Sequence, residues 1–275
     1  MLLDGKKVRD ELLNKYKNKI SSENIKAKLA IIMVGDNDAS KIYIRNKEKY
    51  CKYVGIDVEK HLLDANCSEK ELISLINKLN RDDKITGIIL QSPIPKQIDF
   101  KYVSNLIDFN KDIDGFTEKS IYNLYNNTPI MVPCTVKGII RLLDYYDISL
   151  EGKNVLIIGR GYIVGRPLSM ALLNRNATVT IAHSKTKNLG EKVINSDIII
   201  SAAGVPNLIT KDMVNKNSIL LDVGITRIDN KIKGDIDFDN VYPVCKWITP
   251  NPGGIGPMTI AMIIENIIIA YERER

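Results

Sequence analysis

Short apolar runs rich in β-branched residues alternate with helical patterns through the first part of the chain. The apolar runs are KLAIIMVG (28–35), DVEKHLL (57–63) and ITGIILQ (85–91). Helix-like patterns lie between them, near residues 38–54 and 68–80. Because a connection of this length carries the chain back across a sheet, the order predicts a β-α-β-α-β unit with parallel strands.

A second series of strand-like runs follows. It consists of NVLIIG (154–159), ATVTIAH (177–183), DIIISAAG (197–204) and SILLDVG (218–224), separated by helical or turn-rich stretches. This order is typical of a Rossmann-like fold. The sequence therefore predicts an α/β protein with two domains.

A helix is predicted to link the two series. Pro133, Cys134 and Thr135 form a typical helix entry, and the helical pattern continues to about residue 147.

The last predicted helix, roughly 256–273, is apolar on most sides, so more than one neighbour must cover it. We expect it to pack back on the first domain. That domain then comprises residues 1–138 with 256–275, and the second domain comprises residues 139–255.

Composition and charge narrow the classes of partner. The chain is 44% hydrophobic and 26% charged, which is typical of a globular protein. Its net charge of +6 suits anionic ligands, but the basic residues are spread along the sequence rather than gathered into an arm. Small molecules with phosphate or carboxylate groups are therefore better candidates than nucleic acid.

Cysteine and histidine positions give no sign of a metal site. The four cysteines contain no CxxC pair, and the two histidines, His61 and His183, do not complete a zinc-binding spacing. Reduced thiols in a cytoplasmic protein are the simplest interpretation. No apolar run predicts a membrane span, because the longest late run, IAMIIENIIIA (260–270), is short and contains Glu265 and Asn266.

One lysine lies on the wrong face of the helix predicted over residues 38–54. At about 100° per residue, the apolar face is expected to contain Ala39, Tyr43, Tyr50 and Val54. Lys47 falls on this face. It is either a chemically active group or a long side chain whose ammonium group reaches past the core to water, and the pattern alone favours the second.

A glycine-rich turn follows the first strand of the second series. The strand NVLIIG continues into GRGYIVGRP, with the spacing Gly159-x-Gly161-x-x-x-Gly165. Such a turn between a strand and a helix lets backbone N–H groups approach a pyrophosphate. The alternative is plain turn chemistry. The β-α-β context favours a dinucleotide site.

The next strand indicates which dinucleotide is bound. NAD sites tend to place an acidic residue at this strand end, where it binds the ribose 2′-hydroxyl group. Here the strand ends in AHSKT, so His183, Ser184 and Lys185 offer donors and positive charge, and Arg160 lies in the glycine turn. These groups favour the 2′-phosphate of NADP, unless they are ordinary polar residues at a strand end.

Four features of the first series and the chain end are candidates for a substrate site. Tyr43 and Lys47 are neighbours at i and i+4 on one helix. Gln91 ends a predicted parallel strand, where α/β sheets bind ligands. Asp114 precedes a glycine in KDIDGF, and NPGGIGPMT (251–259) forms a flexible loop.

Each of these candidates also has a structural interpretation. Gln91 could cap a strand, Asp114 could belong to a simple turn, and the loop at 251–259 could be a linker into the last helix. On pattern alone, the function stays open among reductases that act on small anions.

Taken together, strings along nearly the whole chain resemble the bifunctional methylenetetrahydrofolate dehydrogenase/methenyltetrahydrofolate cyclohydrolase family. In order, they are VGDNDASKIYIRNKEKYCKYVGI (34–56), LQSPIP (90–95), KDIDGF (111–116), PCTVKGII (133–140), GRGYIVGRP (159–167), HSKT (183–186), DVGI (222–225) and TPNPGGIGPMT (249–259).

The resemblance implies an enzyme of one-carbon metabolism. It would oxidise 5,10-methylenetetrahydrofolate with NADP and then hydrolyse the methenyl product to 10-formyltetrahydrofolate, which feeds purine biosynthesis. The resemblance also implies a folate-binding catalytic first domain, a cleft between the domains, and a cytoplasmic homodimer.

The resemblance implies roles for individual residues. In the catalytic set, Tyr43 would stack on the folate, Lys47 and Gln91 would form the catalytic pair, and Asp114 would anchor the pterin. The residues implied to bind NADP are Gly159, Arg160, Gly161 and Gly165 in the glycine turn, Ser184, and Ile225 through its backbone. Gly253 and Gly254 would line the cleft on the substrate side.

Elementary chemistry agrees with these roles. A carboxylate such as Asp114 can accept hydrogen bonds from the amino and ring N–H groups of a pterin, and an aromatic face such as Tyr43 suits a flat substrate. A buried lysine gives up its proton more readily than an exposed one, so Lys47 can assist hydrolysis while Gln91 holds it or the developing oxyanion.

Two residues depart from the family pattern. Ser92 and Asn251 stand where apolar residues are more common, which affects the expected substrate affinity and the balance of the two activities. Two other functions compete with the implied one. A shikimate-type NADP dehydrogenase does not account for Tyr43 with Lys47 or for NPGGIGPMT, and a non-catalytic NADP sensor does not account for an intact catalytic set.

Overall fold

The computed structural model describes residues 1–228 and 231–273, which divide into two compact units. The three-stranded unit consists of Glu11–Cys134 and the chain from Ile260 onwards. The five-stranded unit consists of Met1–Asp10 and Thr135–Thr259. Each unit takes its name from its parallel sheet.

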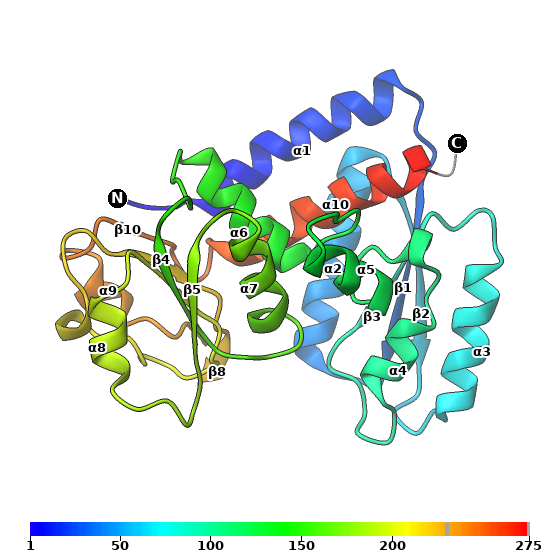
Figure 1. Ribbon diagram of the computed structural model, residues 1–275. Coiled ribbons are helices and arrows are strands. Elements are labelled where there is room, and N and C mark those ends of the chain that lie inside the picture. Colours follow the sequence, from blue (N-terminus) through cyan, green and yellow to red (C-terminus); the bar gives the residue numbers. More distant parts are fainter. Residues whose placement is uncertain (229–230, 274–275) are drawn as a thin grey trace. The chain divides into compact units, whose positions relative to one another are not determined.

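The three-stranded sheet has the order β2-β1-β3 (Figure 1). Its strands are β1 (Lys28–Val34), β2 (Asp57–Leu63) and β3 (Gly87–Gln91), and all pair in parallel. β1 is the central strand, which explains why its sequence is apolar almost throughout instead of alternating. Helices α2 (Asp38–Val54) and α3 (Glu69–Asn80) connect the strands, as the sequence predicts.

The two faces of β1 belong to different hydrophobic clusters because successive side chains point to opposite faces of a strand. Leu29, Ile31 and Met33 pack in a cluster with residues of α2 and of α10 (Ile255–Arg273). Ala30, Ile32 and Val34 pack in a second cluster with residues of α3. The sheet is therefore covered on both faces.

Helix α10 is long and apolar enough to be a candidate membrane span by length and composition. However, 61% of its most apolar window is buried within the protein. Ile263, Ile264 and Ile267 lie fully or almost fully buried in the three-stranded unit, which is the position of a core helix.

The five-stranded sheet has the order β10-β7-β6-β4-β5, with every pair parallel. The four strands predicted for the second series are β4 (Asn154–Ile158), β5 (Thr178–Ala182), β6 (Ile198–Ser201) and β7 (Ile219–Asp222). Three strands of this unit were not predicted: the edge strand β10 (Trp247–Ile248) and the antiparallel pair β8 (Thr226–Ile228) and β9 (Lys231–Lys233). These strands are too short to leave a clear periodic pattern.

The first ten residues lie in the five-stranded unit, whereas the prediction assigned them to the first domain. The Leu3 N–H donates to the Ile248 carbonyl at 2.9 Å, and the Ile248 N–H donates to the Met1 carbonyl at 3.1 Å. The chain start therefore pairs with β10, a contact between segments more than 200 residues apart in sequence.

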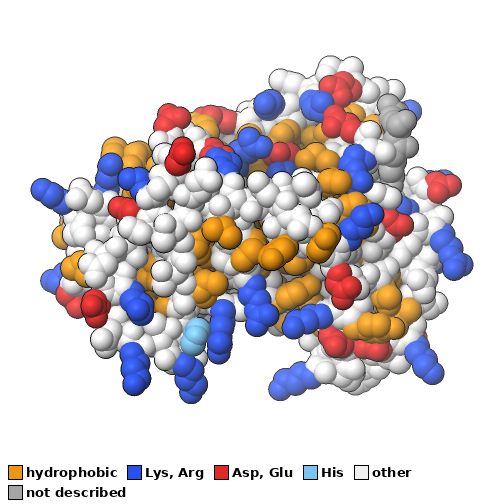
Figure 2. Space-filling model, in the orientation of Figure 1, with side chains coloured by type: hydrophobic (Ala, Val, Ile, Leu, Met, Phe, Trp, Pro, Cys, Tyr) orange, Lys and Arg blue, Asp and Glu red, His pale blue; other side chains and the backbone are white. Residues whose placement is uncertain are grey.

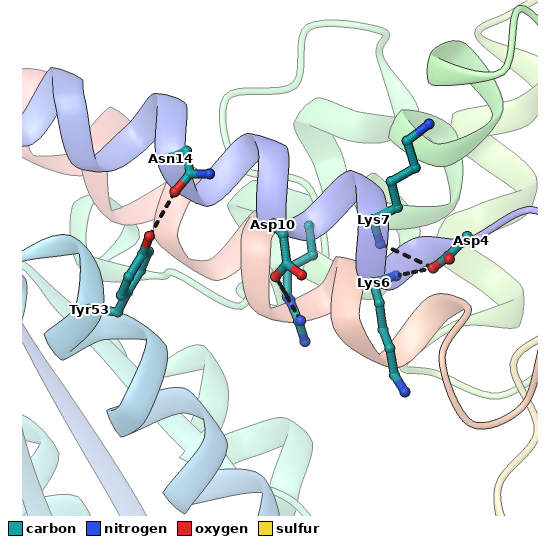
Figure 3. Close-up of polar contacts among 7 residues, drawn as sticks. Asp4, Lys6, Lys7, Asp10, Asn14 and Tyr53 are labelled. Atoms are coloured by element: carbon teal, nitrogen blue, oxygen red, sulfur yellow. Dashed lines mark hydrogen bonds and ion pairs between the residues drawn. The ribbon is translucent and has the colours of Figure 1, made fainter.

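Helix α1 (Gly5–Ser22) continues from this segment, and polar contacts hold it in both units (Figure 3). In the five-stranded unit, Asp4 caps the helix because its Oδ1 accepts the N–H groups of Lys6 at 2.9 Å and Lys7 at 3.0 Å. In the three-stranded unit, the Tyr53 hydroxyl of α2 donates to Asn14 Oδ1 at 2.7 Å.

Short helices complete the two units. In the three-stranded unit they are α4 (Phe100–Asn105), η1 (Phe109–Lys111) and α5 (Glu118–Tyr125). The five-stranded unit contains α7 (Gly165–Leu173), α8 (Leu189–Ile194), η2 (Lys211–Met213) and α9 (Phe238–Val241), and the linking helix predicted near residues 135–147 is α6 (Cys134–Tyr145).

Candidate active site

The buried face of α2 is rotated relative to the predicted one. Its buried residues are Ser40, Ile44, Lys47, Cys51 and Val54. The prediction was wrong for Ala39 and Tyr43, which lie on the exposed side. Lys47 remains on the buried face, and only 8% of it is exposed. Its ammonium group is therefore retained inside the unit, which rules out the interpretation that it reaches past the core to water.

The ammonium group of Lys47 has a specific partner. Lys47 Nζ donates to Gln91 Oε1 at 2.9 Å, and Gln91 Nε2 donates to the carbonyl of Ser92 at 2.7 Å. Gln91 is the last residue of β3 and is itself 9% exposed. The second bond orients the amide of Gln91, so its oxygen points at the lysine. Helix α2 and strand β3 thus bring together two residues far apart in sequence.

Asp114 lies close enough to Lys47 for the two side chains to interact electrostatically. Part of the aspartate surface is accessible, but the surrounding protein atoms raise the pKa of Asp114 above its usual range. The positive charge of Lys47 opposes this rise, and the negative charge of Asp112 adds to it. Lys47, Gln91 and Asp114 therefore form one polar cluster in the three-stranded unit.

Tyr43 lies one helical turn before Lys47 on α2 and is 37% exposed. Its ring is therefore accessible from solvent while still attached to a rigid helix. Partial burial raises the pKa of the Tyr43 hydroxyl above its usual value near 10, so this group stays protonated at neutral pH.

Asp112 holds the loop that carries Asp114, a role that the sequence analysis missed. Asp112 is 2% exposed, and its carboxylate accepts the backbone N–H groups of Gly115, Phe116 and Thr117 at 2.8–3.1 Å. It also accepts the hydroxyl groups of Thr117 and Ser120, at 2.8 and 2.7 Å. The signal was available, because an aspartate shortly before Gly, Thr and Ser is typical of side chain to backbone bonding in a tight loop.

Asn266 of α10 supports the same loop from the other side. It is fully buried, and its Nδ2 donates to the carbonyls of Ile113 at 2.9 Å and Val132 at 3.2 Å. The Cys134 thiol also donates to the Ile113 carbonyl. A lone asparagine in an otherwise apolar helix must find such partners when it is buried, which is the signal that the sequence offered.

Lys111, the first residue of KDIDGF, has a structural role. It is 7% exposed, and its Nζ donates to the carbonyls of Leu79 at 3.2 Å and Asp82 at 2.9 Å. The Leu79 carbonyl lies in the last turn of α3 and the Asp82 carbonyl just beyond it, where the helix C-terminus favours a cation. Lys111 therefore anchors one end of the loop whose other end presents Asp114.

The glycine turn of the five-stranded unit lies between β4 and α7. Gly159 has a φ of 120°, and a Cβ atom there would overlap the carbonyl of Ala202, so the turn requires glycine. A Cβ atom at Gly161 would meet no atom within 4 Å, and Arg160 is exposed. The backbone at Gly161 is thus open to a ligand, and Gly165 begins the helix that follows.

The HSKT turn lies next to the glycine turn because β4 and β5 are parallel neighbours. The Gly159 N–H donates to the Ala182 carbonyl at 2.8 Å. His183 and Thr186 close the turn through two hydrogen bonds, of 2.7 and 2.9 Å. Ser184 is left exposed at its tip. This edge has the positive charge and donors that a 2′-phosphate needs.

The remaining predicted residues also lie in the five-stranded unit. Ile225 follows β7 and is 48% exposed, whereas Gly253 and Gly254 are buried in the loop after β10. The Lys6 N–H donates to the Gly253 carbonyl at 3.1 Å. The predicted site residues are thus divided between the units, with Tyr43, Lys47, Gln91 and Asp114 in the three-stranded one.

No group of three or more His, Cys, Asp and Glu side chains within residues 1–228 and 231–273 could hold a metal ion.

Two protein-family domain models match this chain, one for each of the two predicted domains. The catalytic domain of tetrahydrofolate dehydrogenase/cyclohydrolase matches residues 3–114, and the NAD(P)-binding domain of the same family matches residues 133–275. The chain belongs to the tetrahydrofolate dehydrogenase/cyclohydrolase family. The resemblance noted in the sequence is thereby confirmed, together with a two-domain α/β fold built on parallel sheets.

Individual members of the tetrahydrofolate dehydrogenase/cyclohydrolase family match over almost the full length. The bifunctional protein FolD of Vesicomyosocius okutanii is 46% identical over 272 residues, which cover 98% of each chain. The crystal structure of the bifunctional enzyme FolD from Campylobacter jejuni has a TM-score of 0.97 and 42% identity, and covers 100% of this chain and 99% of its own.

A further structure, from Trypanosoma brucei, is a methylenetetrahydrofolate dehydrogenase-cyclohydrolase complexed with NADP and an inhibitor. It is 29% identical with a TM-score of 0.95, and it covers 100% of this chain and 98% of its own. Shikimate dehydrogenase from Aquifex aeolicus is only 16% identical with a TM-score of 0.55 over 90% of this chain, so it shares the fold alone. The shikimate-type alternative is therefore replaced by the tetrahydrofolate family.

Proposed function

We propose that this chain oxidises 5,10-methylenetetrahydrofolate with NADP and then adds water to the 5,10-methenyl product to form 10-formyltetrahydrofolate. The observation that carries the proposal is the 2.9 Å hydrogen bond between Lys47 and Gln91 beside Asp114. It places a buried lysine side chain, an amide and a carboxyl group together in a member of this enzyme family.

Asp114 and Tyr43 are the residues proposed to hold the folate. The Asp114 carboxylate can accept hydrogen bonds from the amino and ring N–H groups of the pterin. The exposed side of the Tyr43 ring can stack against the flat substrate. Asp112, Asn266 and Lys111 hold the aspartate loop, so Asp114 is presented by a rigid segment.

Lys47 and Gln91 are proposed to carry the hydrolytic step. Water attacks the methenyl carbon, one of its protons must be removed, and a proton must reach the ring nitrogen as the C–N bond breaks. Lys47 is placed to move these protons as a general base and acid. The Gln91 amide is placed to orient Lys47 or to stabilise the oxygen that develops charge.

NADP is the cofactor proposed for the oxidative step, and it supplies the hydride acceptor. The residues proposed to hold it are Gly159, Arg160, Gly161, Gly165, Ser184 and the backbone of Ile225. Open space beside Gly161 suits the close approach of a pyrophosphate. Arg160 and Ser184 suit a 2′-phosphate. The Trypanosoma brucei relative is complexed with NADP, which supports NADP as the cofactor. Because hydride loss leaves a delocalised cation on the substrate, positioning is the main contribution of the protein.

We further propose that the enzyme acts as a cytoplasmic homodimer whose product serves one-carbon metabolism, including purine biosynthesis. Folate derivatives are its proposed partners, with neither nucleic acid nor membrane involved. Lys and Arg side chains are scattered among acidic ones on the visible face, which supports small ligands rather than nucleic acid (Figure 2). The molar mass in solution from light scattering tests the dimer, with twice 30.9 kDa expected.

One assay tests the two activities together. The purified protein is mixed with methylenetetrahydrofolate and either NADP or NAD, and the absorbances of the reduced nicotinamide and of the methenyl intermediate are followed. NADP reduction with little methenyl accumulation is expected. Absence of reduction with either cofactor would refute the dehydrogenase and support a binding protein, and a lasting methenyl signal would refute the cyclohydrolase.

A further inference from the structure

Asn251 makes side-chain contacts that an apolar residue at this position could not make. It lies in the loop after β10, and its Nδ2 donates to the carbonyl of Gly224 at 2.7 Å. Its amide also lies beside the carboxylate of Asp222, the last residue of β7, and acts to lower the pKa of that carboxyl group. Asn251 thus joins the loop after β10 to the loop after β7.

Two buried carboxylates extend this connection across the edge of the sheet. Asp222 is 4% exposed and accepts the N–H groups of Asp235 at 3.0 Å and Ile236 at 3.1 Å. Asp235 is fully buried and accepts the Ser201 hydroxyl at 2.7 Å, together with the backbone N–H groups of residues 203–205 at 2.7–3.3 Å. The loops after β6, β7 and β10 are therefore held by one set of hydrogen bonds.

The backbone is tightly packed around these two carboxylates. A Cβ atom at Gly224 would overlap the Asp235 carboxylate, and one at Gly234 would overlap the Asp222 carboxylate and crowd Asn251 Nδ2. Gly224 is held on its other side as well, because its N–H donates to the Ser201 carbonyl at 3.2 Å. A change at Asn251 must therefore act on Gly224, which precedes Ile225 directly.

The place of this cluster in the fold connects it with ligand binding. It lies at the carboxyl ends of parallel strands, where open α/β sheets bind their ligands. Ile225, half exposed at this edge, is the residue whose backbone is proposed above to bind NADP.

We propose that Asn251 is a positioning residue for NADP, which acts through Gly224 on the backbone of Ile225. The inference rests on the proposed NADP-dependent function. It extends that function to a side chain that stands where the family more often has an apolar residue.

Asp222 gives the proposal a second readout. Burial raises the pKa of Asp222 to about 6, while the N–H groups of Asp235 and Ile236 and the Asn251 amide act to lower it. Asp235 is the titratable group that faces it, and its neighbours on β6 and after β10, Ser201 and Thr249, are uncharged. Loss of the Asn251 amide therefore moves the pKa of Asp222 further up.

The test compares the parent enzyme with Asn251→Val, which removes the amide and keeps a similar volume. We expect the KM and the Kd for NADP to rise about five- to tenfold, the effect of losing one hydrogen bond, while kcat changes less than twofold. The pH dependence of NADP binding, measured by isothermal titration calorimetry, should move to higher pH. Hydrolysis of added methenyltetrahydrofolate, which consumes no NADP, should stay within twofold of the parent rate.

Two further variants complete the test. Asn251→Asp places a second carboxyl group beside Asp222, so NADP binding should weaken at pH 8 and recover partly at pH 5.5. Asn217→Ala, at an exposed asparagine of the same unit, is the matched control and should leave the Kd for NADP unchanged. If Asn251→Val is poorly folded, the Kd and pH dependence of Asn251→Asp decide the question.

Several results would overturn the inference. They are an unchanged Kd for NADP in Asn251→Val, a rise confined to the KM for methylenetetrahydrofolate, or an equal loss of hydrolysis, which would indicate general damage. If the parent protein itself neither binds nor reduces NADP, the proposed function fails, and that result is distinct from any difference between parent and variant.

Discussion

The two units present functional groups in different ways. In the three-stranded unit, side chains form the candidate site: Lys47 is buried and bonded to Gln91, and Asp114 lies within range of its charge. In the five-stranded unit, the main chain forms it, with a turn that only glycine can make at Gly159 and an open approach at Gly161. Chemistry on the substrate requires groups that exchange protons, whereas binding a pyrophosphate requires N–H groups that no side chain blocks.

Each unit also buries carboxylates that support its site. Asp112 accepts hydrogen bonds from its own loop and fixes the segment before Asp114. Asp222 and Asp235 accept hydrogen bonds from segments that follow different strands. Asp112 stabilises a single loop, whereas Asp222 and Asp235 join several loops. Substitutions at the two places should therefore change stability and ligand binding in different ways.

The largest effect is expected for Lys47→Met. Removing the proton-transfer group should lower the rate of methenyltetrahydrofolate hydrolysis by about 10²- to 10⁴-fold, because general acid–base catalysis contributes on that order. Part of the NADP reduction should remain, since that step depends mainly on positioning. Lys49→Met, at an exposed lysine of the same helix, is the control. Parent-like hydrolysis in a folded Lys47→Met protein would contradict the assignment.

Asp112→Ala should be the most destabilising change among the supporting residues. It leaves several buried donors without an acceptor, so the free energy of unfolding should fall by about 2–4 kcal/mol. The KM for methylenetetrahydrofolate should rise because the Asp114 loop loses its anchor. Urea unfolding and steady-state kinetics measure the two effects, with Asp83→Ala at an exposed aspartate as the control. A change in stability without any change in KM would show that the loop held by Asp112 does not contribute to substrate binding.

The pH dependence of stability tests the buried carboxylates of the five-stranded unit. Burial raises the pKa of Asp222 from 3.8 to about 6, so the folded state binds a proton more tightly than the unfolded state. Stability is therefore expected to fall as pH rises from about 4 to 6, by up to roughly 3 kcal/mol from this group. Asp222→Asn should remove this contribution, which unfolding curves at pH 4, 5, 6 and 7 would reveal. The raised pKa of Asp114 acts in the same direction and remains in the variant.

The smallest expected effect concerns cofactor choice. Arg160→Ala should raise the KM for NADP about tenfold and leave the KM for NAD nearly unchanged, because only NADP carries the 2′-phosphate. Initial rates with both cofactors measure the ratio, and Arg175→Ala, beyond the end of α7, serves as the control. An equal loss with both cofactors would place Arg160 near the pyrophosphate instead.

Local patterns predicted most of the two parallel sheets, but helix α1 at the chain start was not predicted. The three strands of the first series, four of those in the second, the linking helix and the last helix all lie where periodicity placed them, because burial on a sheet or helix repeats at a fixed period. The glycine turn and the HSKT turn were also recognised from their sequence context. The boundary at the chain start was not, because residues 1–3 pair with β10 through backbone hydrogen bonds that impose no side-chain pattern.

The sequence by itself determined which residues could do chemistry and on which elements they lie, since residue type and period are local properties. Only the tertiary structure decided how they meet. It rotated the buried face of α2 away from Tyr43, joined Lys47 to Gln91 across 44 residues, and gave Asp112, Asn266 and Asn251 their partners. The physical reason is that a buried polar group must be satisfied by whatever donor or acceptor the packed chain brings near it, and that neighbour is set by topology rather than by sequence distance.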